Sequence, residues 1–291
     1  MQRTLRGISL MNVRDYAENA GDVFVLPEAV IKIKQLINDD ATSMDDIAEV
    51  INYDPAIMSQ VLKISNSALY KFPNTINTVT KAIQVIGTRS IYDLVLAYGV
   101  ANAFKNIDPD VIDLEKFWEH SVNCALLCKF LAEEVGLKEP EKMFVCGLLH
   151  NLGELVLVQL NPEEASKCAS ISTENTPLML QKKHLGFSYA DVSFELLKLW
   201  GIPLDIAQIV SKIHVSEYIA QSKEEKIIQL AYLLTLNNIN SELYATHADI
   251  TEDMYQSLGI ELGSVNNALD FSNLQLMSAL ALFSPSSFAM F

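Results

Sequence analysis

Signals that begin a helix recur along almost the whole chain. In one kind, a serine is followed three residues later by an acidic residue whose carboxylate can bond back to the serine amide. In the other, a side chain that accepts hydrogen bonds stands directly before a proline, which suits the first helical position because no N–H is needed there. The first kind occurs at residues 43–46, 188–191 and 222–225, and the second at 54–55, 161–162 and 176–177. Signals this frequent predict a chain made mainly of helices.

Turn-forming residues are scarce, which supports the same fold class. The chain has 11 glycines and 9 prolines among 291 residues, about 7%, where roughly 12% is usual. Apolar residues such as Ile57, Val61 and Ile64 recur at helical spacing, and Gly87 and Gly186 stand where helices are expected to stop. No alternating strand of useful length and no repeat period is found. The sequence therefore predicts an all-α fold.

A polar stretch at residues 106–110 divides the sequence into two halves. Short helices are expected before it and longer amphipathic helices after it, and a charged turn at 221–226 leads into a further helical region. No segment resembles a flexible linker, so the halves are expected to pack as one body. We predict an N-terminal segment at 1–20, a domain at 21–221 with parts at 21–110 and 111–221, and a C-terminal helical extension at 222–291.

The charge and the apolar pattern of the sequence indicate which partners and which cellular compartment to expect. With 36 acidic and 21 basic residues the formal charge is −15, and no cluster of basic residues offsets it, so nucleic acid is a disfavoured partner. The apolar stretches at 148–160 and 274–291 are interrupted and fall short of the roughly 20 residues of a membrane span. Neither a signal peptide nor a disulfide framework is expected from the first residues or from the four cysteines. We therefore expect a cytoplasmic protein with no membrane partner.

Five blocks of sequence resemble the HDOD family, the HD-related output domain of bacterial signalling proteins. They are the stretch from Tyr53-Asp-Pro to Tyr70, Ala82-Ile-Gln-Val-Ile-Gly87, Phe117-Trp-Glu-His-Ser121, Cys146-Gly-Leu-Leu-His-Asn-Leu-Gly-Glu154, and Trp200-Gly-Ile-Pro203 followed by His214. The resemblance extends from about residue 25 to 218. It implies an N-terminal helical bundle packed on a five-helix HD-like core, and a relationship to the HD phosphohydrolases, in which histidines and carboxylates hold divalent metals.

Residue by residue, the resemblance implies a degenerate metal site. His120 and His150 match the two metal-binding histidines. Tyr189 and Ile213 stand where related chains often have further histidines, and His214 remains as a possible third ligand. Asn151 stands where the paired aspartate belongs, and Tyr232 stands at the position of the late aspartate. The loss of a unit charge about 4 Å from a cation removes about 4 kcal/mol at an effective dielectric constant of about 20, roughly three decades of affinity. We therefore expect no metal cofactor and no catalytic residue.

Two nearby features leave alternatives open. Glu154 lies on the same helical face as His150 and is either a replacement carboxylate for the site or a residue that pairs with its neighbours. His120, Cys124 and Cys128 recur at intervals of four, but zinc needs four ligands and no Cys-x-x-Cys pair is present, so small core cysteines are favoured.

The resemblance implies a non-catalytic signal-transduction module that acts by binding a signalling protein. The expected partner surface lies between the two halves. Its candidate residues are Asn66, Ser67, Tyr70, Phe72 and Pro73, which also suit a capped helix end with aromatic packing.

Two other functions remain as alternatives. One is a divalent-metal phosphohydrolase or phosphodiesterase, which would need Mn, Fe, Mg or Zn. The other is a nucleotide receptor that uses the vestigial cleft. No phosphate-binding glycine loop, dinucleotide fingerprint or Gly-x-Ser-x-Gly motif is present in the sequence.

Overall fold

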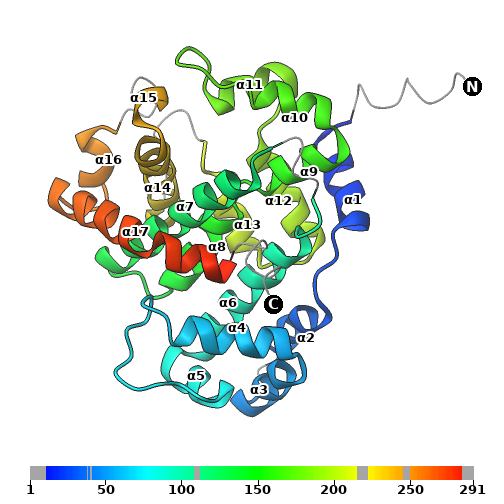
Figure 1. The fold of residues 1–291 in the computed structure, drawn as a ribbon, viewed down its shortest axis with the longest axis vertical. Coiled ribbons are helices and arrows are strands. Elements are labelled where there is room, and N and C mark those ends of the chain that lie inside the picture. The colour runs from blue at the N-terminus through cyan, green and yellow to red at the C-terminus, as the bar shows by residue number, and fades with distance from the viewer. Residues whose placement is uncertain are drawn as a thin grey trace, which may run out of the picture.

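The computed structural model describes residues 11–37, 39, 41–107, 112–214, 222–244 and 250–283. Within these residues the protein is all-α, as predicted (Figure 1). Across this described part, the β pairing is limited to one isolated bridge between Ser172 and Asn175. The expected domain boundaries near 110 and 221 lie outside the described residues, so those boundaries remain predictions.

Helices begin at the positions that the helix-start signals of the sequence predict. Ser43 and Ser188 each form a complete capping box with an aspartate three residues on, and the Ser222 side chain accepts a hydrogen bond from the amide of Glu225. Asp54, Asn161 and Thr176 cap helices that begin with proline. Gly87 and Gly186 have positive φ angles of 97° and 82° beside helix ends, a conformation that glycine adopts without strain.

A group of short helices forms the N-terminal bundle, which lies at the lower end of the molecule in Figure 1. The longest of them, α6, is buried almost continuously from Ile91 to Ala101 and packs against α8 of the following half. The bundle and the core are therefore in direct contact. The bundle comprises α2 (Glu28–Ile37), α3 (Met44–Tyr53), α4 (Pro55–Ser65), α5 (Val79–Ile86) and α6 (Thr88–Ala103).

The core is built around α7, which packs on α8, α14 and α17. Gly147 permits the close approach of α8 to α7, because a Cβ atom there would lie 2.6 Å from the Cα of Ala125. Gly153 does the same for α9 against the backbone of Tyr189 on α12. The helices of this half are α7 (Leu114–Glu134), α8 (Pro140–Leu149), α9 (Leu152–Leu160), α10 (Pro162–Cys168), α11 (Pro177–His184), α12 (Tyr189–Leu199) and α13 (Leu204–Ser211).

Segments at both ends of the chain pack onto this core. The first helix, α1 (Val13–Val23), lies against α12, and the Tyr16 hydroxyl accepts a hydrogen bond from Asn161 at 2.9 Å. The last helix crosses α7, and its end reaches the N-terminal bundle, where Gln60 of α4 donates to the carbonyl of Leu282. The C-terminal helices are α14 (Lys223–Ile239), α15 (Ser241–Tyr244), α16 (Glu252–Gln256) and α17 (Leu262–Phe283).

One apolar stretch differs from the sequence expectation. Among the described residues, Pro140–Leu160 is long and apolar enough to cross a membrane by length and composition, although the segment 148–160 was expected to be too short and too interrupted. Residues 140–147 of α8, which lie outside the expected stretch, extend the apolar run. Within it, 78% of the most apolar window is buried in the protein, so this stretch supplies core-forming helices.

Candidate functional site

Five helices, α7, α8, α9, α13 and α14, carry or adjoin the predicted metal-site positions in the core half, and His120 lies on α7. His150 ends α8, Asn151 precedes α9, and Glu154 lies in the first turn of α9. Tyr232 on α14 makes edge-on ring contacts with His214, which follows α13, at 4.8 Å and with His150 at 5.7 Å. We call this set the histidine cluster; it comprises His120, His150, Asn151, Glu154, His214 and Tyr232.

His150 is the most buried member of the cluster, with 2% of its surface exposed. Its Nδ1 donates to the carbonyl of Gly147 at 2.6 Å, which directs Nε2 toward the interior. The thiol of Cys124 on α7 lies beside this ring. Burial alone would lower the pKa of His150, but Cys124 and the Gly147 carbonyl raise it above its ordinary value.

Asn151 and Glu154 are bonded to each other. The amide nitrogen of Asn151 donates to the Glu154 carboxyl group. Burial raises the pKa of Glu154 to about 7, although both the hydrogen bond and His150 favour its charged form. The one carboxylate beside the predicted metal position is therefore engaged with an amide and holds a proton over part of the neutral range.

The remaining members of the cluster are uncharged at neutral pH. Burial, with the proximity of His150, lowers the pKa of His120 and of His214 to about 3, so both imidazoles are neutral. Burial also raises the pKa of Tyr232 well above its ordinary value, so the phenol keeps its proton. His120, His214, Tyr232, Asn151 and Glu154 are all half-buried.

This donor set does not fit the divalent metals of a hydrolytic centre. Such a centre uses carboxylates that bridge two ions or neutralise one, whereas here an amide and a phenol occupy two of the positions. In the described part of the chain, no group of three His, Cys, Asp or Glu side chains is arranged to hold a metal ion.

The four cysteines are buried free thiols. Cys124 and Cys128 both point into the core from α7, one turn apart. The sequence interpretation as core cysteines agrees with this burial but did not anticipate that Cys124 would adjoin His150. The other two histidines are not part of the cluster: His184 lies in the last turn of α11, and His247 lies outside the described residues.

The residues predicted to contact a partner, at and after the end of α4, differ in their burial and in their contacts. The side chain of Asn66 bonds both the N–H and the carbonyl of Ile76, each at 2.8 Å, and thereby fastens the following loop. Ser67 donates to the Ile64 carbonyl at 2.7 Å. Phe72 stacks on Tyr70 with ring centroids 5.9 Å apart, and Pro73 is exposed. Asn66 and Ser67 thus stabilise the end of α4 and the loop that follows it through hydrogen bonds to the backbone.

Tyr70 points inward, into a set of polar groups that sequence reasoning missed. Its hydroxyl donates to Glu141 at 3.2 Å, and the Lys129 ammonium group lies 4.2 Å from the centre of its ring. Lys129 also pairs with Glu141 at 3.2 Å, and Ser90 donates to the same carboxylate at 3.3 Å. We call these four residues the buried ion cluster. A lysine within the apolar run around Cys128 and Phe130 was the available sequence signal.

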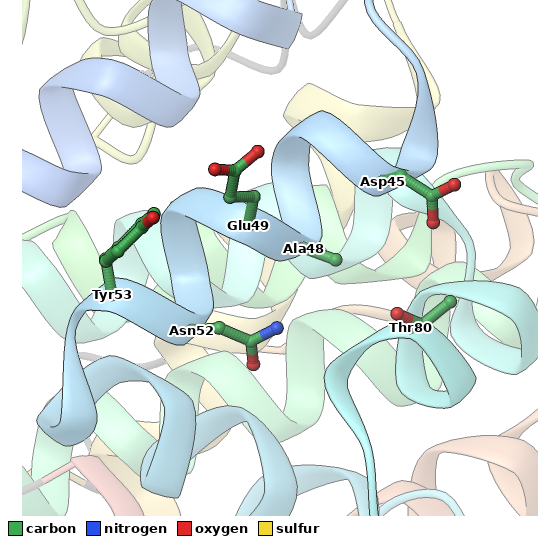
Figure 2. Close-up of a pocket in the computed structure, with 6 residues that line it drawn as sticks. All are labelled: Asp45, Ala48, Glu49, Asn52, Tyr53 and Thr80. Carbon is green, nitrogen blue, oxygen red and sulfur yellow. The ribbon is translucent and has the colours of Figure 1, made fainter.

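A groove in the surface lies between α3 and α5 (Figure 2). It has a volume of about 280 Å³. We call it the α3–α5 groove. No sequence pattern had singled it out, and its lining residues are Asp45, Ala48, Glu49, Asn52, Tyr53 and Thr80.

Comparisons with known proteins agree with this fold. The family model of the HDOD domain matches residues 23–216. An uncharacterized protein of Treponema pallidum (strain Nichols) is 23% identical over 230 residues, which are 78% of this chain and 44% of that protein. The chain therefore spans less than half the length of this curated relative.

Three solved structures are similar over almost all of the chain. An HDOD domain protein of unknown function from Geobacter sulfurreducens has a TM-score of 0.73 at 20% identity, covering 93% of this chain and 98% of its own. A Shewanella amazonensis SB2B protein provisionally assigned as a phosphohydrolase has a TM-score of 0.70 at 22% identity, covering 91% and 98%. A Marinobacter aquaeolei VT8 protein provisionally assigned to signal transduction has a TM-score of 0.70 at 20% identity, covering 94% and 66%. With an all-α HD-like fold and a family match over most of its length, this chain belongs to the HDOD domain family.

Proposed function

We propose that this chain is a non-catalytic bacterial signal-transduction module that acts in the cytoplasm by binding a protein partner. The observation that carries the proposal is the bond between Asn151 and Glu154 in the histidine cluster. It occupies the only carboxylate of the cluster with a neutral amide, at the position where a hydrolytic HD centre needs an anionic metal ligand.

The charge state of the cluster supports the same proposal. His120 and His214 are neutral imidazoles, and Tyr232 is a neutral phenol in contact with two of the rings. A dinuclear centre that activates water carries several positive charges, and these need anionic ligands to hold them. What is left for the domain is recognition through its surface, because function resides in sites rather than in the fold.

The competing function is a metal-dependent phosphohydrolase, the provisional assignment of the Shewanella protein. The test combines elemental analysis of protein purified without an affinity tag with a phosphodiesterase assay on bis(p-nitrophenyl) phosphate in Mn²⁺ or Mg²⁺. We expect substoichiometric metal and no turnover. Stoichiometric Mn, Fe or Zn, together with turnover that His120→Ala and His150→Ala abolish, would overturn the proposal. His184→Ala is the matched control, because it removes an imidazole that lies outside the cluster.

A gain-of-binding variant sharpens the test. Asn151→Asp restores a unit charge next to His150, and we expect it to raise the Mn²⁺ affinity of the site by up to roughly three decades. Isothermal titration of the wild type and the variant measures this change. Equal affinity in the two proteins would mean that the amide at position 151 is not what prevents metal binding.

A further inference from the structure

The α3–α5 groove is lined on one side by α3 and on the other by the start of α5. Figure 2 shows Asn52 directed toward the α5 side, where Thr80 lies, and Glu49 on the outer side of α3 with Tyr53 one turn further on. Asp45 lies at the opposite end from Tyr53. The groove is thus a short trough with a carboxylate at one end and an aromatic ring at the other.

The polar groups of this groove lack partners within the protein. In the described part of the chain, the side chains of Asp45, Glu49 and Asn52 form no hydrogen bond and no ion pair. Two other surface acids are engaged: Glu28 on α2 pairs with Lys32 at 2.8 Å, and Asp46 on α3 itself accepts a bond from its cap serine. The groove therefore presents several acceptor oxygens that are available to a ligand.

Tyr53 adds an exposed aromatic face to these oxygens. Its surface is 80% exposed, the highest value among the large apolar and aromatic side chains described. Next to the groove, Met44 is 47% exposed. An exposed aromatic ring beside unpaired carboxylates attracts a cation through its negative face as well as through charge.

The size of the groove suits a single side chain. Sites that enclose a whole small molecule usually measure roughly 300–1,000 Å³, and this groove has about 280 Å³ and is open to solvent. Its acceptor groups and the formal charge of −15 disfavour an anion. A guanidinium group fits best, because its planar donors match a carboxylate and its face stacks on an aromatic ring.

We propose that the α3–α5 groove binds an arginine side chain in a basic segment of a partner protein. Glu49 supplies the carboxylate, Asn52 supplies a carbonyl oxygen, and the ring of Tyr53 covers the guanidinium, while Asp45 at the other end of the trough adds attraction at longer range. This inference rests on the proposed function, since it names the chemistry of the partner that such a module recognises.

The test uses the full chain and two probe peptides that differ in one group. Each is a fluorescein-labelled pentapeptide with one central residue among alanine and leucine: arginine in one, and neutral citrulline, which has nearly the same shape, in the other. With isotope-labelled protein, the arginine peptide is expected to shift backbone amide signals of residues 45–53 and 79–81, and the citrulline peptide is expected to leave them unchanged. Equal effects of the two peptides, or shifts scattered over the molecule, would overturn the inference.

Single substitutions separate specific recognition from general attraction to an acidic protein. Glu49→Gln and Tyr53→Ala are each expected to weaken arginine-peptide binding by about two- to fivefold. Glu174→Gln removes one exposed carboxylate outside the groove and is expected to have no effect beyond a general charge effect. An equal loss in Glu174→Gln and Glu49→Gln would show nonspecific attraction and refute the site. A lysine peptide that binds as well as the arginine peptide would refute the choice of arginine.

Failure of this inference is distinguishable from failure of the proposed function. A purified signalling partner that binds wild type and the Glu49→Gln/Tyr53→Ala double variant equally would exclude the groove. Metal-dependent hydrolysis by the wild type would exclude the proposed function, whatever the arginine peptide does. Both groove residues are exposed, so unchanged urea unfolding midpoints are expected to verify that the variants fold.

Discussion

Two clusters of polar side chains lie inside this molecule, and they are stabilised in opposite ways. In the buried ion cluster, Lys129 and Glu141 form an ion pair at 3.2 Å, and the carboxylate accepts further bonds from Tyr70 and Ser90. In the histidine cluster, burial and the proximity of His150 lower the pKa values of His120 and His214, so these two imidazoles are neutral, whereas Cys124 and the Gly147 carbonyl raise the pKa of His150. An opposite charge nearby favours the charged form of a buried group, whereas burial favours its neutral form.

The largest effect is expected from breaking the charged cluster. Glu141→Ala leaves the Lys129 ammonium group buried, with Glu133 as its nearest remaining carboxylate at 3.8 Å. Loss of one partner of a buried pair usually costs 3–5 kcal/mol, and Glu133 softens this, so we expect about 3 kcal/mol less stability in urea unfolding. The matched control is the double variant Lys129→Met/Glu141→Leu, which is expected to recover most of the loss. A cost below about 1 kcal/mol for Glu141→Ala would contradict the comparison.

The second prediction concerns the neutral cluster and pH. In the unfolded chain, His214 takes up a proton below pH about 6.5, but in the folded chain it does so only near pH 3. Stability is therefore lost as the pH falls below about 6.5. Linkage gives up to about 2 kcal/mol at pH 5, and we expect about 1 kcal/mol because the ring is half-buried and keeps some hydration.

His214→Phe isolates this contribution. The phenyl ring keeps the contact with Tyr232 but cannot titrate, so the variant is expected to lose about 1 kcal/mol less than the wild type between pH 7 and pH 5. Glu154 acts with the opposite sign, because its raised pKa stabilises the folded state as the pH falls from about 7 toward 4.5. That contribution is common to both proteins and is removed in the difference. Equal pH dependence of unfolding in the two proteins would refute the assignment.

The smallest effect is expected from removing the hydrogen bond between Tyr70 of the N-terminal half and Glu141 of the core half. Tyr70→Phe removes the hydroxyl that donates to Glu141 and leaves the ring beneath Lys129. We expect a loss of about 1 kcal/mol, near the value of an ordinary hydrogen bond, because the carboxylate keeps its other partners. The urea midpoint measures the loss, and a double-mutant cycle with Ser90→Ala shows whether the two hydroxyls act independently.

The sequence anticipated features that depend on neighbouring residues. Helix starts at Ser43, Asp54 and Ser188 follow from side chains that cap amides within three residues, so local chemistry sufficed. The family resemblance placed His150 and Tyr232 in one site, and their rings are in contact. Prediction was most successful where a motif encodes its own geometry.

Features that depend on distant partners were not anticipated. Tyr70 and Glu141 are 71 positions apart, so the inward direction of Tyr70 follows only from the packing of α7 and α8 against the loop after α4. The α3–α5 groove escaped notice for a related reason. Whether Asp45 and Glu49 have partners depends on which helices surround α3, and no spacing within α3 encodes that. The buried state of Pro140–Leu160 also depends on its neighbours.

The last turn of α17 has a mechanical consequence. Phe283 is fully buried with its ring 5.0 Å from Phe144 of the core, while the preceding residue, Leu282, is bonded to Gln60 of the N-terminal bundle. The last turn of α17 therefore contacts both the N-terminal bundle and the core. Release of this turn would expose the Phe283 ring and break the bond between Gln60 and Leu282, so the last turn of α17 ties the C-terminal helix to both the bundle and the core.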